Sequence, residues 1–105
     1  MSTAFFSPPE CRGHDMGAGH PECPQRLDAI ADHLLATGLD IALEHRDAPP
    51  VTVEQLERAH SANYVMRLKD LLERLAAEGR HKALDPDTIA MPATWGAALR
   101  AAGAA

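Results

Sequence analysis

Apolar and polar residues alternate with a helical period over a long stretch that begins just after Pro24. The apolar positions recur at i, i+3, i+7 and i+8, so they share one helix face: Leu27, Ile30, Leu34 and Leu35. Pro24 suits the start of a helix, where a missing N–H costs nothing, and Gly38 suits the C-terminal end. The pattern predicts a helix over residues 24–37.

A second amphipathic stretch predicts the longest helix, over residues 62–78. Its apolar stripe has helical spacing and consists of Val65, Leu68, Leu72 and Leu75. Gly79 is expected to end it. A shorter helix is expected before it, over residues 53–60. Thr52 and Gln55 stand in the positions of a capping box, which indicates where that helix begins.

The last helix and the strands are shorter. Thr94 is expected to cap a C-terminal helix with an apolar face made of Trp95, Ala98, Leu99 and Ala102. Residues 3–7 form an apolar run closed by two prolines, which predicts a short strand that is buried on both faces if the sheet is parallel. Alternation over residues 40–46 predicts a second strand. Residues 80–92 have no period and contain two prolines, so a loop is expected there.

Four helices and two short strands predict an unfinished α/β architecture. Two strands rarely form a stable sheet by themselves, because independent sheets usually need three or more strands or heavy packing support. A chain of 105 residues also buries only about two-thirds of its unfolded surface, which allows a modest core. We therefore expect residues 1–105 to form the N-terminal segment of a larger α/β domain, with no second domain.

Charge and composition exclude several classes of partner. The net charge is −5 and the basic residues do not cluster, so a nucleic-acid partner is not expected. No run approaches the roughly 20 apolar residues that span a bilayer. The N-terminus also lacks the basic and apolar regions of a signal peptide. We expect a cytoplasmic chain without a membrane partner.

Candidate metal ligands concentrate around the irregular loop over residues 14–24. Cys11 and His14 are separated by two residues, as are His20 and Cys23, and such pairs suit tetrahedral zinc. The connector between the pairs is short compared with the 12 or so residues usual in zinc fingers. The alternative is that the histidines orient the loop by hydrogen bonds and the cysteines are small buried thiols.

Two carboxylates stand close together in the expected loop over residues 80–92. Asp85 and Asp87 flank a proline, so they form either a carboxylate pair or simply a turn. The sequence contains no nucleophile-elbow, phosphate-loop or H-E-x-x-H motif. Spacing by itself therefore does not identify a reaction.

The run from His14 to Leu27 resembles the opening signature of the histone deacetylase superfamily. The likeness is to its bacterial branch of deacetylase-like and acetylpolyamine amidohydrolase-like enzymes. The His-Pro-Glu-x-Pro-x-Arg-Leu element that begins at His20 is its most specific part. The resemblance continues over residues 4–104, in the segments 48–49, 56–60, 64–65, 84–88 and 95–104.

This resemblance implies an arginase/deacetylase-type fold, in which helices cover a parallel sheet and a zinc ion activates water to hydrolyse an amide. Asp87 resembles the family's rim aspartate, which hydrogen-bonds the backbone of the acylated substrate. The 14–24 loop resembles the loop beside the entrance of the acyl-lysine tunnel, and in some relatives it contributes to a structural zinc site. The resemblance thus implies an acetylated lysine or polyamine as substrate, and substrate-binding roles for Asp87, His20, Pro21 and Glu22.

The family's paired histidines, Asp/His/Asp zinc ligands and catalytic tyrosine match nothing within residues 1–105. The resemblance therefore implies no catalytic residue in this chain. Zinc is expected in the full-length family but not for this chain alone, and the 105 residues by themselves are expected to be inactive. Two alternatives stay open. One is a small non-catalytic interaction module that self-associates or complements a second fragment, and the other is a small structural zinc module.

Overall fold

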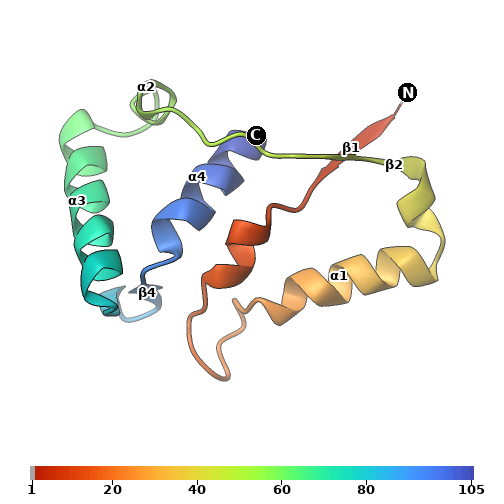
Figure 1. The fold of residues 1–105 in the computed structure, drawn as a ribbon, viewed down its shortest axis with the longest axis horizontal. Coiled ribbons are helices and arrows are strands. Elements are labelled where there is room, and N and C mark those ends of the chain that lie inside the picture. Colours follow the sequence, from red (N-terminus) through yellow and green to blue (C-terminus); the bar gives the residue numbers. More distant parts are fainter. Residues whose placement is uncertain (1) are drawn as a thin grey trace.

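The four predicted helices are present in the computed structural model, which describes residues 2–105 (Figure 1). Three of them have nearly the predicted bounds. The fourth, α2, is half the predicted length. The helices are α1 (Gln25–Ala36), α2 (Val53–Leu56), α3 (Ala62–Glu78) and α4 (Thr94–Ala104).

Local capping explains where α2 and α3 begin and end. The Oγ1 atom of Thr52 accepts from the Gln55 backbone N–H at 3.2 Å, and the Gln55 side chain accepts from the Thr52 N–H at 2.9 Å. The capping box is therefore confirmed. The predicted extension to residue 60 is wrong, because the backbone bonds after Leu56 include i→i−3 bonds, which tighten the chain into turns. Gly79 ends α3 at φ 63°.

The N-terminal sheet is a parallel pair of strands, β1 (Thr3–Phe6) and β2 (Leu43–Arg46). The predicted strand over 40–46 is half right, since Leu39–Ala42 form the 3₁₀-helix η2 instead. The expected burial of β1 on both faces is also wrong. Its first two residues are exposed and its two phenylalanines are half-buried, because β2 is its single neighbour among residues 2–105.

The expected loop over 80–92 contains an antiparallel hairpin of β3 (Lys82–Asp85) and β4 (Thr88–Ala90). The Asp85 carboxylate accepts from the Asp87 backbone N–H at 2.8 Å, which closes the turn between the strands. The hairpin escaped sequence detection because its strands are four and three residues long and mostly exposed. Ala90 is its one buried residue.

Helix α4 lies at the centre of the molecule, between α3 and the 3₁₀-helix η1 (Pro9–Gly13) (Figure 1). Its backbone carbonyl at Leu99 accepts from the Val51 N–H at 3.0 Å. The Arg100 guanidinium donates to the Ala48 carbonyl oxygen at 2.7 Å. The prediction that Thr94 caps this helix is wrong. Ala93 holds the N-cap position, and the Thr94 hydroxyl accepts from the Met91 N–H at 2.9 Å.

The core is small and joins α3, β4 and α4. Leu72, Leu75 and Ala90 are buried together, with Trp95 and two further leucines of α3 packed against them. The radius of gyration is 15.5 Å, compared with about 13 Å for a compact domain of this size. Large apolar side chains remain exposed outside the core, among them Leu35, Leu39 and Ile41. No helix within residues 2–105 is long and apolar enough to cross a membrane.

Two glycines of α4 provide a matched test of how closely this helix packs against the segment around Pro49. A Cβ on Gly103 would collide with the backbone of Pro49, whereas a Cβ on Gly96 would meet nothing within 4 Å. We expect Gly103→Ala to destabilise the fold by roughly 1–3 kcal/mol through overpacking. Gly96→Ala is expected to stabilise it by about 0.5–1 kcal/mol through helix propensity.

Urea unfolding followed by circular dichroism measures both free energies. Opposite signs for the two variants support close docking of α4 on the segment around Pro49. Equal stabilisation by both substitutions would contradict it.

Candidate functional site

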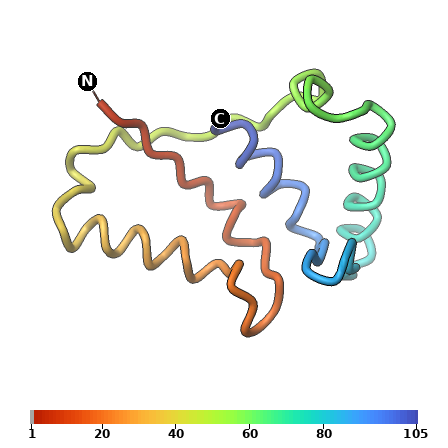
Figure 2. Tube along the Cα trace, turned by 180° about the vertical axis from the view of Figure 1, so that it is seen from behind, coloured from red at the N-terminus to blue at the C-terminus, as the bar shows by residue number. Residues whose placement is uncertain are grey.

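The 14–24 loop lies against the β3–β4 hairpin and the start of α4, although these segments are about 70 residues apart in sequence (Figure 2). The loop turns at Gly17 and Gly19, which have φ values of 102° and 83°. Such angles strain residues that carry a Cβ, so glycine is favoured at both positions. The Asp15 carboxylate also accepts from the Gly17 N–H at 2.9 Å. The loop is thus shaped by its own sequence before it reaches the hairpin.

Two methionine sulfurs hold the loop to the hairpin strand and its continuation. The Ile89 N–H donates to the Met16 sulfur at 3.3 Å, and the Asp15 N–H donates to the Met91 sulfur at 3.0 Å. Met16 is buried, with 4% of its surface exposed. Because thioether sulfur is a weak acceptor, the burial of Met16 supplies most of the free energy that holds the loop on the hairpin. The two hydrogen bonds fix the position of the loop along the strand. No pattern in the sequence indicates a role for either methionine.

His20 and Asp87 meet where the loop touches the tip of the hairpin. The His20 Nε2 atom lies 2.8 Å from an oxygen of the Asp87 carboxylate. The His20 side chain is 21% exposed and that of Asp87 is 89% exposed. Two of the four residues expected to bind substrate are therefore in direct contact. Asp87 presents its carboxylate to solvent at the top of the turn.

The other two expected substrate-binding residues lie on the same loop but make different contacts. Pro21 is exposed. The Glu22 carboxylate is half-exposed and lies 3.8 Å from His14 Nε2. Glu22 thus lies toward His14, whereas His20 lies toward the hairpin.

The structure does not gather the four candidate zinc ligands. The Cys11 thiol donates to the Ala97 carbonyl oxygen at 3.7 Å, and His14 Nδ1 lies 2.9 Å from the Thr94 hydroxyl. His20 pairs with Asp87. Burial, reinforced by the negative charge of Glu10, raises the pKa of the Cys11 thiol. This disfavours the thiolate that zinc requires.

Across residues 2–105, no three His, Cys, Asp or Glu side chains come together in a group that could hold a metal ion. Cys11 and His14 bond to α4 and His20 bonds to the hairpin, while Cys23 is half-buried just before α1. His14 and His20 form hydrogen bonds that link the loop to α4 and to the hairpin.

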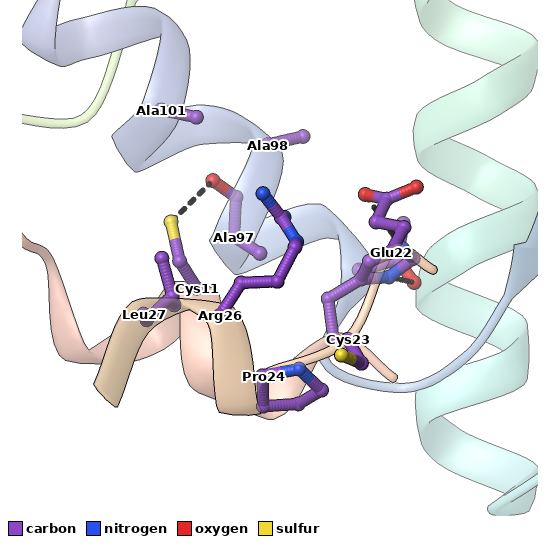
Figure 3. Close-up of a pocket in the computed structure, with 11 residues that line it drawn as sticks. Cys11, Glu22, Cys23, Pro24, Arg26, Leu27, Ala97, Ala98 and Ala101 are labelled. Atoms are coloured by element: carbon purple, nitrogen blue, oxygen red, sulfur yellow. Dashed lines mark hydrogen bonds and ion pairs between the residues drawn. The ribbon is translucent and has the colours of Figure 1, made fainter. Parts of the chain in front are cut away.

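A pocket of about 360 Å³ lies between the N-terminal end of α1 and α4 (Figure 3). Its polar lining includes His14, Glu22 and Arg26, and Figure 3 shows the Arg26 side chain reaching across it toward α4. Small residues form the wall on α4: Ala97, Ala98 and Ala101. No motif in the sequence predicts this pocket. The signal available was the run of alanines along α4, whose small side chains leave space beside η1 and α1.

Comparisons with known proteins identify the family and the fold. The family model described as histone deacetylase domain matches residues 20–105. A 67-residue stretch, 64% of this chain, is 39% identical to the histone deacetylase-like amidohydrolase of Pseudomonas aeruginosa, of which it covers 16%. The crystal structure of the HDA15 HD domain superposes with a TM-score of 0.79 at 26% identity, covering 97% of this chain and 29% of that chain.

The chain thus spans less than a third of the length of either relative. Its α/β fold, with four helices and one parallel strand pair, matches part of a deacetylase domain, as the sequence predicted. Because the family model matches well over half of its residues, the chain belongs to the histone deacetylase family.

Proposed function

We propose that residues 1–105 supply the substrate-binding rim of a zinc-dependent deacetylase domain that hydrolyses acetyl-lysine or acetylpolyamine amides. One observation carries the proposal. Asp87 stands at the exposed tip of the hairpin with its carboxylate held by His20 of the 14–24 loop. The match to a deacetylase domain and the similarity to an amidohydrolase support the reaction class.

Asp87 is suited to bind a substrate backbone. An ionised carboxylate has about four acceptor positions on its two oxygens. The contact with His20 uses one oxygen of Asp87, so acceptor capacity remains for substrate amide N–H groups. Bonds from neutral donors to a charged acceptor contribute about 1.5–3 kcal/mol each. In this proposal Asp87 orients the acylated chain at the rim and takes no part in bond cleavage.

The zinc chemistry of the family does not fit the residues of this segment. A hydrolytic zinc needs about three protein ligands with an open position for water, and residues 2–105 contain no group of three suitable side chains. We therefore assign no hydrolytic step to these residues. In the proposal, the metal ligands and the groups that activate water lie outside this segment.

The 105 residues by themselves are expected to show no amide hydrolysis. The physical reason is that residues 2–105 contain no group of three side chains that could hold a metal to activate water. A fluorogenic acetyl-lysine peptide and an acetylpolyamine, each assayed with and without added zinc, provide the measurement. Turnover above background that a chelator abolishes would overturn this expectation.

A chimaera tests the role of Asp87. Residues 14–105, which include the 14–24 loop and the region that matches the family model, replace the corresponding segment of the Pseudomonas aeruginosa amidohydrolase. We expect the chimaera to hydrolyse the acetyl-lysine peptide. Asp87→Ala should raise KM roughly ten- to a hundredfold with little change in kcat, because the lost bonds position the bound substrate.

Asp70→Ala is the matched control, since Asp70 is an exposed carboxylate on α3. It should leave KM within about twofold of the unsubstituted chimaera. An active chimaera whose KM is insensitive to Asp87→Ala would refute the rim function.

A second function, self-association, is favoured by the exposed apolar surface near the parallel strand pair. Parallel sheets are normally covered on both faces, yet β1 is exposed at its first two residues. Leu39 and Ile41, in the 3₁₀-helix before β2, are 56% and 91% exposed. Contiguous exposed apolar residues are typical of interaction sites.

Sedimentation velocity over a range of concentrations tests this function. We expect the chain to associate, and the double substitution Leu39→Lys and Ile41→Lys to shift it toward monomer. Met66→Lys is the control, because Met66 is 63% exposed on the distant helix α3. A chain that stays monomeric at every concentration would exclude self-association.

A further inference from the structure

His20 joins two loops through both nitrogen atoms of its ring. Its Nδ1 atom accepts the backbone N–H of Glu22 at 3.0 Å, within the 14–24 loop. Its Nε2 atom contacts the Asp87 carboxylate at 2.8 Å, across 67 residues of sequence. The ring is largely sheltered from solvent, whereas its partner carboxylate is almost fully exposed. An exposed side chain is therefore tied to a sheltered one.

The two contacts together select one protonation state of His20. A backbone N–H can only donate, so Nδ1 must contribute its lone pair to the Glu22 bond. An ionised carboxylate can only accept, so Nε2 must carry the proton that it donates to Asp87. The Nδ1–H tautomer would place two donors face to face at Glu22 and two acceptors face to face at Asp87. A doubly protonated ring would lose the Glu22 bond.

We propose that His20 is a positioning residue, which as the neutral Nε2–H tautomer fixes the Asp87 carboxylate at the rim. The inference rests on the proposed function of Asp87 as the acceptor for substrate. The turn orders the Asp87 backbone through its bond to Asp85, but among the contacts of its side chain the bond to His20 is the one that selects an orientation. An acceptor oriented in advance binds more tightly, because less rotamer freedom is lost on binding.

The loop does not depend on His20 to stay in place. The Met16–Ile89 and Asp15–Met91 contacts already hold it to the hairpin strand and to the start of α4. Loss of the His20 side chain should therefore release the Asp87 carboxylate without undocking the loop. This separates a positioning role from a general structural one.

Two substitutions of His20 each remove one of its two hydrogen bonds and keep the other. The Asn side-chain oxygen can occupy the place of Nδ1, so His20→Asn keeps an acceptor for the Glu22 N–H and loses the donor to Asp87. The Gln side-chain nitrogen can occupy the place of Nε2, so His20→Gln keeps the donor to Asp87 and loses the acceptor for Glu22. The pair differs by one methylene and tests each bond separately.

Nuclear magnetic resonance of the isotope-labelled 105-residue chain in neutral buffer tests the geometry directly. In the unsubstituted chain we expect His20 to carry its proton on Nε2, and observation of the Nδ1–H tautomer would overturn the proposal even if a variant failed to fold. The Asp87 side-chain carboxyl signal should shift in His20→Asn and stay near its original position in His20→Gln. Equal shifts in both variants, or the reverse order, would also overturn it.

The chimaera with the Pseudomonas aeruginosa amidohydrolase then separates this inference from the proposed function. His20→Asn should raise KM for the acetyl-lysine peptide several-fold at unchanged kcat, and His20→Gln should restore most of the loss. In an Asp87→Ala background, His20→Asn should add nothing further. If Asp87→Ala raises KM while Asn and Gln at position 20 behave alike, the positioning role fails and the rim function stands. If the magnetic resonance result holds and Asp87→Ala has no effect, the rim function fails instead.

Discussion

The burial of Ala90 against Leu72 and Leu75 is the contact on which the candidate site depends. It fixes the hairpin strand β4 on α3, and the chain then turns directly into α4, whose Trp95 packs on the same cluster. The hairpin tip, with Asp87, is thereby placed beside the 14–24 loop. A small side chain at position 90 matters because it allows the strand backbone to approach the leucines closely. The core is modest, but it lies where two helices and the rim meet.

Hydrogen bonds to unusual acceptors complete the rim. Two backbone N–H groups donate to methionine sulfurs, and a histidine ring bridges a backbone N–H and a carboxylate. Each bond by itself is weak or exposed, so none would hold the loop alone. In one bond the loop backbone donates to a side chain beyond the hairpin, and in another the hairpin backbone donates to a side chain of the loop. Together the bonds restrict the movement of the loop relative to the hairpin. A candidate site made of two loops takes its geometry from such cross-links.

Two of the candidate zinc ligands form hydrogen bonds with α4. His14 bonds the Thr94 hydroxyl at the start of α4, and the Cys11 thiol bonds a carbonyl of the same helix. Both donors are therefore used to attach η1 and the loop to α4. In the sequence, sulfur and imidazole stand in closely spaced pairs. In the fold, Cys11 and His14 bond to α4, whereas His20 bonds to the hairpin. A metal site requires convergence in space, which pair spacing alone does not provide.

The sequence alone indicated the four helices and the family. The helical period of α1 and α3, the capping box at Thr52 and the glycine at position 79 act locally, so they can be identified without a structure. The tertiary structure decided the hairpin, the exposure of β1, and the pairing of His20 with Asp87. The exposure of β1 and the His20–Asp87 pair depend on contacts between residues some 40 to 70 positions apart. The hairpin is local, but its short strands with a single buried alanine leave no periodic signal. Local geometry depends on neighbouring residues. The packing of the elements decides which distant side chains come into contact.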